Sequence, residues 1–426
     1  MNSLEIASIL GAKHEGQAVD VEGFCIDSRR IKPKQAFIAI RGERLDGHDF
    51  VTEAQNLGAT LAIVQKPVQA NITKILVSDT KEALFKLAKA KREKFRGKII
   101  AISGSAGKTT TKELISFLLS KTFKVCKTPG NFNSQIGVPL SILNFGECEI
   151  WVLELGASKP SELKKLIKLS NPDIRVLTAI GEEHLETFGD LKGVISSASE
   201  LFWEMKDSQI GVLPKEALDH FKIARRAVFS IDEIKNLTLG DEGIRALLGS
   251  TEIALQVPSL GLLKSALCSI KVLEVMDLDW VNYSKYLKEF EPPEGRFRPI
   301  KWGSWLLIDD TYNANPLSVK NALESLNYFS GQKLAVLGDM LELGEFSESL
   351  HRQIGQICAS LGIECWFFGL WMQKAYQECI KARGRCFILE TPEQIKERIK
   401  DGRGVIIFKG SRAVRMERFI KSIIES

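Results

Sequence analysis

A short glycine-containing stretch constrains this chain more than any other part of its sequence. Residues 103–110 read Ser-Gly-Ser-Ala-Gly-Lys-Thr-Thr and follow an apolar run at 98–102 that is typical of a buried parallel strand. Beyond the stretch, apolar residues stand at 114, 115, 117, 118 and 119, which is the spacing of an amphipathic helix. A strand, a glycine loop and a helix in this order form the setting of a phosphate-binding loop.

The residue types in this loop suit a nucleoside triphosphate. Gly104 and Gly107 let backbone N–H groups approach phosphate oxygens, and the helix N-terminus adds the positive end of its dipole. Lys108 can reach the β- and γ-phosphates, and the Thr109 hydroxyl can bind Mg²⁺. Ile102 stands where the general Walker pattern has glycine, so a chance glycine turn before a helix is the alternative. The flanking strand and helix favour nucleotide binding. We expect the nucleotide to contact Gly104, Ser105, Ala106, Gly107, Lys108, Thr109 and Thr110.

The length of the chain and a proline- and glycine-containing boundary predict several domains. A chain of 426 residues is too long for one ordinary hydrophobic core. Candidate strands alternate with candidate helices throughout, and Pro-Pro-Glu-Gly at 292–295 marks a boundary. We therefore expect an α/β protein with a small α/β domain at residues 1–97, a central P-loop ATPase-type parallel sheet at 98–294, and a C-terminal Rossmann-like domain at 295–426.

Composition argues against several classes of protein. The net charge of +5 is modest, and no basic stripe interleaved with aromatic residues indicates nucleic-acid binding. No apolar stretch is long enough to span a bilayer, and the first residues lack the pattern of a leader. The eight cysteines include no Cys-x-x-Cys pair, and Cys25, Cys268 and Cys358 lie in apolar runs. We therefore expect reduced thiols, no zinc site and a cytoplasmic protein. We also expect a monomer.

The N-terminal region combines short strands with polar loops. Candidate strands at 37–40 and 59–64 flank a candidate helix at 50–57. Ser28 and Arg29, in the loop Ile-Asp-Ser-Arg, could hold a diphosphate, although a surface turn would have the same composition.

Two strand ends of the central region carry candidate metal ligands. Glu154 follows a candidate strand at 149–153, and a carboxylate there points into the crevice where α/β sheets bind ligands. A helix-start carboxylate is the alternative. His184 lies just past a candidate strand at 174–178. It could be a metal ligand or could form a structural hydrogen bond. The polar loop 129–139 is a further functional candidate.

Polar motifs also follow three of the four strands expected in the last domain, at 305–308, 333–337, 364–368 and 405–408. The motifs are Asp-Asp-Thr-Tyr-Asn-Ala-Asn-Pro at 309–316, Gly-Asp-Met-Leu-Glu-Leu-Gly at 338–344, and Lys-Gly-Ser-Arg at 409–412. Because parallel strands place their C-termini at one edge, these motifs predict a common binding edge.

Taken together, these motifs resemble the Mur ligase family, which builds the cytoplasmic peptidoglycan precursor, and the resemblance covers nearly the whole chain. The shortened glycine pattern at 104–110 looks like the family's own and accounts for Ile102. The motifs at 310–316 and 337–344 look like those of the member that adds D-alanyl-D-alanine to UDP-N-acetylmuramoyl-tripeptide. The resemblance implies ATP and Mg²⁺ as cofactors, small-molecule substrates and a UDP-sugar-binding first domain.

The resemblance also implies residue roles. Lys108 would neutralise phosphate charge, Thr109 and Glu154 would hold one Mg²⁺, and His184 would hold a second. Arg296, at the hinge, would contact phosphate when the last domain closes. The nucleotide would also meet Asn313, Asp309 and Asp310. The other substrates would meet Ser28, Arg29, Asp46, Gly47, His48, Asn133 and Asn315.

Two positions depart from the family pattern. Ala198 stands where relatives often carry a lysine, carbamylated in several members, near the second Mg²⁺. Lys264 stands near the place of the adenine-contacting asparagine. The alternatives are another Mur-type or folylpolyglutamate-type ligase, or an ATP-binding module without ligase chemistry. The sequence leaves open whether the acceptor peptide ends in diaminopimelate or lysine.

Overall fold

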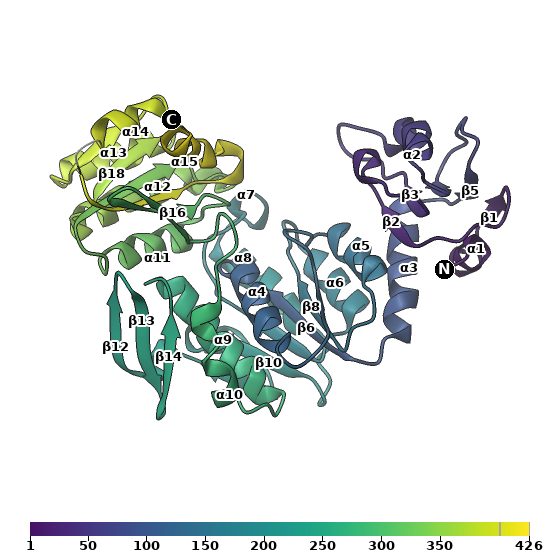
Figure 1. Cartoon of the computed structure of the whole chain (residues 1–426), viewed down its shortest axis with the longest axis horizontal. Coiled ribbons are helices and arrows are strands. Elements are labelled where there is room, and N and C mark those ends of the chain that lie inside the picture. Colours follow the sequence, from purple (N-terminus) through teal and green to yellow (C-terminus); the bar gives the residue numbers. More distant parts are fainter. Residues whose placement is uncertain (400–401, 426) are drawn as a thin grey trace. The chain divides into compact units, whose positions relative to one another are not determined.

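The computed structural model describes residues 1–399 and 402–425, drawn in colour in Figure 1. The chain divides into two compact units. The first consists of residues 1–101, 122–156 and 164–173, and the second of residues 102–121, 157–163 and 174–426.

A five-stranded sheet forms the N-terminal part of the first unit. Its order is β1-β5-β4-β3-β2, with β1 antiparallel to β5 and the other pairs parallel. The strands are β1 (Lys13–Glu15), β2 (Gly23–Cys25), β3 (Gln35–Ile38), β4 (Leu61–Val64) and β5 (Thr73–Leu76). The helices are α1 (Ser3–Leu10), α2 (Val51–Asn56) and α3 (Thr80–Lys94). The strand β4 is buried along its whole length, as expected for a strand inside a parallel sheet.

The central sheet has six strands in the order β11-β10-β9-β6-β8-β7. The strands are β6 (Lys98–Ser103), β7 (Val125–Lys127), β8 (Ile150–Glu154), β9 (Ile174–Leu177), β10 (Ile210–Pro214) and β11 (Arg226–Phe229). The pairs β7–β8, β9–β10 and β10–β11 are parallel. The apolar runs that predicted β6, β8 and β9 are buried almost throughout, because parallel strands are covered on both faces.

Helices and a small antiparallel sheet complete the middle of the chain. The helices are α4 (Lys108–Leu119), α5 (Gly137–Asn144), α6 (Glu162–Ser170), α7 (Leu185–Phe188), α8 (Leu191–Ser199), α9 (Leu260–Val275) and α10 (Val281–Ser284). The small sheet consists of β12 (Ile234–Gly240), β13 (Gly243–Leu248) and β14 (Thr251–Leu255). The sequence around these three strands had predicted no element, since short apolar runs and charges alternate there without a clear period.

The last sheet has six strands in the order β15-β16-β20-β17-β18-β19, and only β15 runs antiparallel to its neighbour. The strands are β15 (Arg298–Trp302), β16 (Trp305–Asp310), β17 (Gln332–Gly338), β18 (Glu364–Phe368), β19 (Cys386–Ile388) and β20 (Gly404–Lys409). The helices are α11 (Pro316–Leu326), α12 (Ser347–Leu361), α13 (Met372–Lys381), α14 (Glu393–Arg398) and α15 (Glu417–Ile424). The four strands predicted in this region are confirmed, and β15 and β19 were not predicted.

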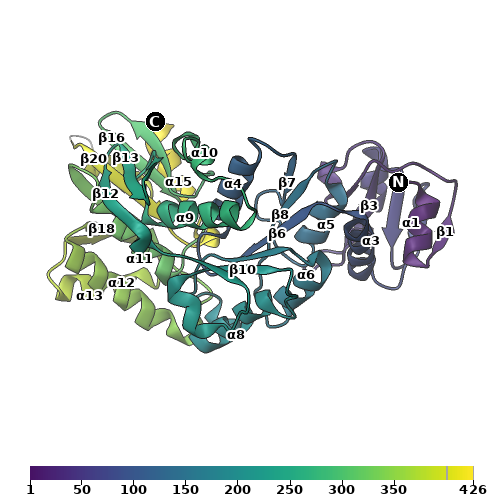
Figure 2. The same ribbon diagram turned by 90° about the horizontal axis from the view of Figure 1, so that it is seen from below.

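Helices cover this last sheet. Figure 2 shows α12 and α13 side by side, and these two helices pack against each other. Apolar residues of α14 and α15, such as Ile395 and Phe419, form one buried cluster with Val336, Ile406 and Phe408 of the strands. The C-terminal ends of β16, β17 and β20 leave the sheet at one edge, where the three polar motifs follow them.

The structure brings four of the eight cysteines together in two pairs, which the sequence did not predict. Cys126 lies beside Cys148 and Cys379 lies beside Cys386, with Cα–Cα separations of 5.8 and 6.6 Å. The cysteines of the two pairs lie 22 and 7 positions apart in the sequence, so neither pair has the Cys-x-x-Cys spacing. Cys25, Cys268, Cys358 and Cys365 are free thiols, and the last three are buried.

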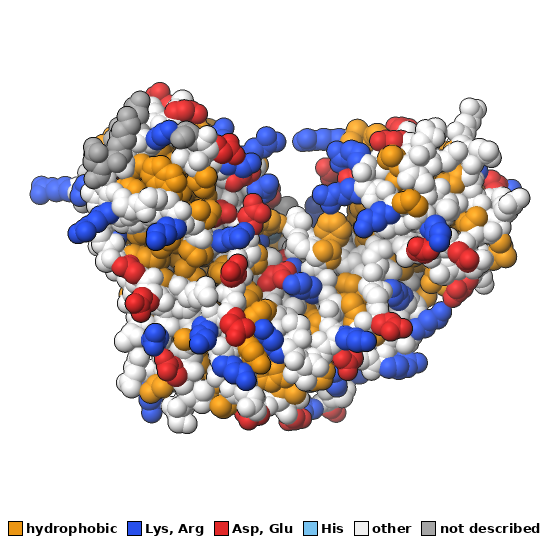
Figure 3. All heavy atoms as spheres, viewed as in Figure 1, with side chains coloured by type: hydrophobic (Ala, Val, Ile, Leu, Met, Phe, Trp, Pro, Cys, Tyr) orange, Lys and Arg blue, Asp and Glu red, His pale blue; other side chains and the backbone are white. Residues whose placement is uncertain are grey.

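No helix in the part of the chain that the structure describes has the length and apolarity needed to cross a bilayer. On the face drawn in Figure 3, Lys and Arg side chains are interspersed with Asp and Glu side chains.

Candidate nucleotide-binding site

The glycine loop between β6 and α4 has the backbone of a phosphate-binding loop. Gly104 and Gly107 have φ values of +133° and +82°, in the region that favours glycine. A Cβ on Gly104 would lie 2.4 Å from Thr178 Oγ1 and 2.9 Å from the backbone of Ala179. Gly107 is the N-cap of α4, so the loop runs directly into the helix N-terminus. The loop can therefore present backbone N–H groups and a helix dipole to an anion.

The strand end of β9 supports this loop from the side. Thr178 Oγ1 donates to the carbonyl of Ala106 at 2.6 Å, and the backbone N–H of Ser105 donates to the carbonyl of Ala179 at 2.9 Å. On the other side, Thr111 Oγ1 donates to Ser265 Oγ of α9 at 3.1 Å. These bonds satisfy polar groups of a tight loop, which would otherwise be costly to bury.

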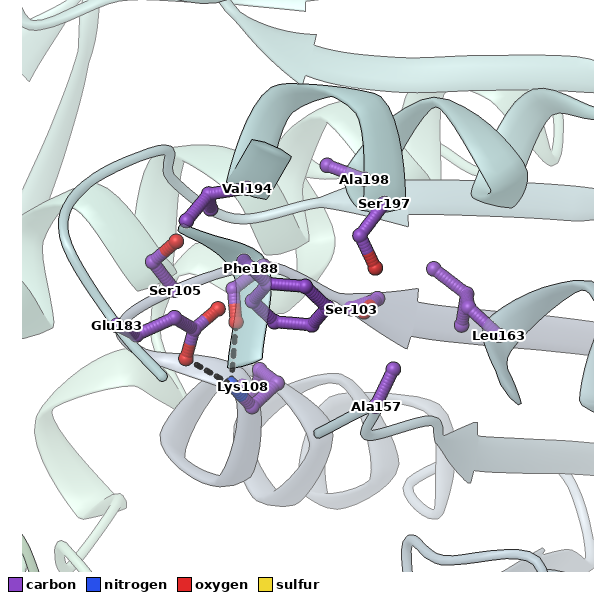
Figure 4. Close-up of a pocket in the computed structure, with 11 residues that line it drawn as sticks. Ser103, Ser105, Lys108, Ala157, Leu163, Glu183, Phe188, Val194, Ser197 and Ala198 are labelled. Carbon is purple, nitrogen blue, oxygen red and sulfur yellow. Dashed lines mark hydrogen bonds and ion pairs between the residues drawn. The ribbon is translucent and has the colours of Figure 1, made fainter. Parts of the chain in front are cut away.

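Lys108 lies in a pocket above the loop (Figure 4). Its Nζ donates to the carbonyl of Gly104 and lies 3.3 Å from an oxygen of Glu183, and both side chains are largely buried. The pocket is small and partly open to solvent. It is lined by Ser103, Gly104, Ser105, Lys108, Ala157, Leu163, Glu183, Phe188, Val194, Ser197 and Ala198.

His184 is held in a defined orientation beside this pocket. It adopts a left-handed conformation, with φ at +48°, and is the N-cap residue of α7. Its Nδ1 lies 2.6 Å from Glu342 Oε2, which comes from the motif after β17. The hydrogen bond to Glu342 raises the pKa of His184, against the effect of burial, and it lowers the pKa of Glu342.

Arg296 and Asn315 bring the last part of the chain to the phosphate-binding loop. An Nη of Arg296 donates to Thr109 Oγ1 at 3.1 Å, and its guanidinium lies 3.9 Å from the ring centroid of Tyr312. Asn315 Nδ2 donates to the carbonyl of Ser105 at 2.9 Å, while its Oδ1 caps α11. The structure thus joins two predicted residues to a loop that lies about two hundred positions earlier.

Asp309 and Asp310, the last two residues of β16, have partners within the protein. Asp309 accepts from the backbone N–H groups of Gly295 and Thr311 at 3.0 and 3.2 Å. Asp310 lies 2.7 Å from Nζ of Lys409, and burial raises the pKa of this carboxyl while the lysine opposes the rise. Lys409 also donates to the carbonyl of Asn313 at 3.0 Å. Asn313 itself is exposed.

A buried histidine organises the neighbouring motif at 338–344. His351 is fully buried, its Nδ1 lies 2.6 Å from the carbonyl of Ser347, and its Nε2 lies 3.0 Å from the backbone N of Met340. The second bond makes Nε2 an acceptor, so the ring is neutral. Burial lowers the pKa of His351.

Within the first unit, Glu154 and Asn133 lie together. Glu154 ends β8 and is buried, and its Oε1 accepts from Asn133 Nδ2 at 2.9 Å. The carbonyl of Asn133 accepts from the backbone N–H of Gly156 at 2.8 Å. Two predicted residues, one from the polar loop and one from the strand end, are therefore neighbours.

The predicted substrate loops of the first unit are tied by internal bonds. Arg29 is highly exposed and pairs with Asp27 at 2.8 Å, while Ser28 donates to Glu53 at 2.8 Å. Asp46 accepts from Lys66, which is the main reason why its pKa is well below the usual range, and it also pairs with Nδ1 of His48.

His48 is buried, and its Nε2 accepts from the backbone N–H of Gln65 at 3.0 Å. A Cβ on Gly47 would lie 2.7 Å from the carbonyl of Ile40, so this turn also requires glycine.

Three residues of the site were not singled out from the sequence. Glu183 stands beside His184 after a strand end, which was a usable signal. Glu342 and Lys409 lie in motifs that were noted, but only the fold shows that they meet His184 and Asp310. Lys264, on α9, places its Nζ 3.6 Å from a carboxylate oxygen of Glu216.

The fold and the site define a nucleotide-binding α/β protein. Its P-loop is contacted by Arg296, which precedes β15, and by Asn315, which follows β16. Three family models match the chain: "Mur ligase family, catalytic domain" at residues 20–93, "Mur ligase middle domain" at 102–256, and "Mur ligase, glutamate ligase domain" at 295–416. The chain belongs to the Mur ligase family.

Its relatives include two bacterial enzymes that share one name. The UDP-N-acetylmuramoyl-tripeptide--D-alanyl-D-alanine ligase of Bacillus subtilis is 32% identical over 95% of this chain and 94% of its own length. The Escherichia coli enzyme of the same name is 28% identical over 99% of this chain and 98% of its own length.

Solved structures agree with these relatives. MurF from Acinetobacter baumannii has a TM-score of 0.90 at 26% identity and covers 99% of this chain and 98% of its own. MurF ligase from Thermotoga maritima, in complex with ADP, has a TM-score of 0.84 at 31% identity, covering 95% and 97%.

Proposed function

We propose that this chain is an ATP-dependent ligase that joins D-alanyl-D-alanine to UDP-N-acetylmuramoyl-tripeptide during synthesis of the peptidoglycan precursor. The observation that carries the proposal is the P-loop of a Mur ligase fold, with Lys108 in its pocket and with Arg296 and Asn315 brought to it. The named relatives, similar over nearly their whole length, support the choice of substrate.

The chemistry forms an amide from a carboxylate, which is a poor electrophile. A carboxylate oxygen of the tripeptide attacks the γ-phosphorus of ATP, giving an acyl phosphate and ADP. The amine of D-alanyl-D-alanine then attacks the carbonyl carbon, and phosphate leaves from a tetrahedral intermediate. Phosphoryl transfer asks a protein mainly for positioning and charge neutralisation.

Several residues of the site suit these tasks. Lys108 and the N–H groups of residues 104–110 would hold the β- and γ-phosphates, and Arg296 would add a second positive charge beside Thr109. The exposed Asn313, with Asp309 and Asp310 holding its loop, would face the nucleotide.

Mg²⁺ is part of the proposal, as a Lewis acid that neutralises phosphate charge. Among the described residues, no cluster of three or more His, Cys, Asp or Glu side chains forms a ready metal site. Mg²⁺ generally binds through one or two carboxylates together with substrate phosphates. Thr109 and Glu154 would hold one ion and His184 a second.

The remaining substrate contacts are proposed from the polar loops. Ser28, Arg29, Asp46, Gly47 and His48 would hold the UDP-sugar, with His48 keeping its loop in shape through Asp46. Asn133 and Asn315 would contact the other substrates.

We also propose domain boundaries at 1–97, 98–294 and 295–426. The three matched family segments at 20–93, 102–256 and 295–416 fall inside these ranges and support them. We also propose that the chain works as a monomer, which light scattering tests. A location in the cytoplasm follows from the proposed use of ATP.

Phosphate release tests the proposed function. ATP and Mg²⁺ are supplied with UDP-N-acetylmuramoyl-tripeptide, carrying diaminopimelate or lysine, with and without D-alanyl-D-alanine. We expect release that requires both substrates and a pentapeptide product of matching mass. ATP binding without coupled release would favour the non-catalytic module instead. Folylpolyglutamate synthase from Mycobacterium tuberculosis shares the fold at 12% identity and a TM-score of 0.60, so a folate substrate is the second control.

A further inference from the structure

The pocket above the phosphate-binding loop contains one acidic side chain. Among the described residues that line it, Lys108 is the one cation and Glu183 the one anion, and the others are apolar residues, serines and glycine. Figure 4 shows the Glu183 carboxylate beside the Lys108 amine, reaching in from the segment that follows β9. Among the described lining residues, Glu183 is therefore the one carboxylate that can bind a cation in this pocket.

The part of the pocket lining that comes from α8 carries no charge. It consists of Val194, Ser197 and Ala198. Ala198 is the position at which the family resemblance leads one to expect a lysine-borne carboxylate. A methyl group there cannot bind a metal ion, so α8 provides no carboxylate to the pocket.

The neighbour of Glu183 is already oriented as a metal ligand would be. His184 Nδ1 is bound by Glu342 at 2.6 Å, which leaves Nε2 as the ring nitrogen for another partner. A carboxylate bound to one nitrogen of a ligating histidine is the usual means of fixing its ring and tautomer. Glu342 is thus a positioning residue for His184, which directly follows Glu183 in the chain.

We infer that Glu183 supplies the carboxylate ligand of the second divalent cation in this chain, in place of a group on α8. The inference rests on the proposed function, because the cation arrives with ATP. In the structure Glu183 pairs with Lys108. Once phosphate oxygens engage Lys108, the carboxylate loses its partner and can bind Mg²⁺, for which oxygen is the preferred ligand.

Binding of Mn²⁺, as a paramagnetic substitute for Mg²⁺, tests this assignment. The full-length protein is saturated with a non-hydrolysable ATP analogue, and free Mn²⁺ is counted by electron paramagnetic resonance during a titration. We expect two Mn²⁺ per wild-type complex. Glu183→Gln should weaken the second by about 10- to 100-fold, and Glu183→Asp should restore part of the affinity.

Glu186→Gln is the matched control. It removes one negative charge three residues away, from a side chain that is exposed and does not line the pocket. We expect it to bind Mn²⁺ as the wild type does. Circular dichroism of each variant checks that the fold is retained.

Two results would overturn the assignment. One is a Glu183→Gln protein that binds the second Mn²⁺ with wild-type affinity, even if its affinity for the analogue changes, since Glu183 would then only hold Lys108. The other is a single Mn²⁺ in the wild-type complex. A different result would contradict the proposed function itself: a wild-type protein whose phosphate release does not depend on D-alanyl-D-alanine.

Discussion

Replacing Gly104 by alanine tests whether the phosphate-binding loop depends on the missing side chain. The φ of +133° costs an L-residue about 1–3 kcal/mol. The new Cβ would also lie 2.4 Å from Thr178 Oγ1 and 2.9 Å from backbone atoms of Ala179. The backbone contact cannot be relieved by a side-chain rotation, so overpacking adds about 1–3 kcal/mol. We expect the free energy of unfolding to fall by about 2–6 kcal/mol in total.

Alanine variants of two other glycines distinguish the cost of backbone strain from the cost of the steric clash. Gly107→Ala has a φ of +82°, but its Cβ would meet nothing closer than 3.7 Å, so it carries backbone strain of about 1–3 kcal/mol without a clash. Gly146→Ala has neither strain nor a neighbour within 4 Å, and should change stability by about 0.5 kcal/mol or less.

Urea unfolding, followed by circular dichroism, measures the stability of all three variants, and a fluorescent ATP analogue measures nucleotide affinity. If the loop moves to relieve the clash in Gly104→Ala, the stability loss shrinks but the nucleotide affinity falls. The reasoning is refuted if Gly104→Ala matches Gly146→Ala in both measurements.

Three further predictions concern charged and titratable side chains. Lys409→Met leaves Asp310 buried without its cation, so the free energy of unfolding measured in urea should fall by about 3–5 kcal/mol. Adding Asp310→Asn should recover part of this loss. A Lys409→Met protein as stable as the wild type would contradict the prediction. Burial lowers the pKa of His351 below that of an unfolded histidine, so its contribution to stability is complete above about pH 6.5 and is lost as the pH falls toward the folded pKa. His351→Gln should reduce the slope of unfolding free energy against pH below about 6.5 by at most about 1.4 kcal/mol per pH unit, and an unchanged slope in urea titrations would argue against a buried neutral ring. Lys108→Ala should keep the fold, by circular dichroism, but lower the rate of phosphate release by about 10²–10³-fold or more. Retained turnover would show that Lys108 does not serve the phosphates.

Local patterns in the sequence were sufficient for the elements that carry the site. The strands β6, β8, β9, β16, β17, β18 and β20 were predicted because each is a short apolar run, buried on both faces. Gly104 and Gly107 were recognised as loop glycines because their neighbours are a strand and a helix, and both have positive φ. The edge strand β19 and the sheet β12–β14 were missed, since short strands with exposed residues have no clear apolar period.

Pairings over long distances in the chain could not be predicted in the same way. Nothing near Cys126 in the sequence indicates that it lies beside Cys148, and nothing near Asp310 indicates that Lys409 neutralises it. Such pairs depend on which strands become neighbours in a sheet.

The kind of chemistry could be read without any coordinates: a strand, a glycine loop, a lysine and a helix stand in a spacing that a phosphate site explains best. Which side chains meet that loop depends on how the chain folds. Glu183 shares its pocket with Lys108 because the segments that follow β6 and β9 leave the central sheet from neighbouring strands. Arg296 and Asn315 reach the loop from the segments before β15 and after β16, in the last sheet. Neighbouring residues specify backbone conformation through short-range sterics and hydrogen bonds, whereas the convergence of strand ends arises only when the sheets have formed.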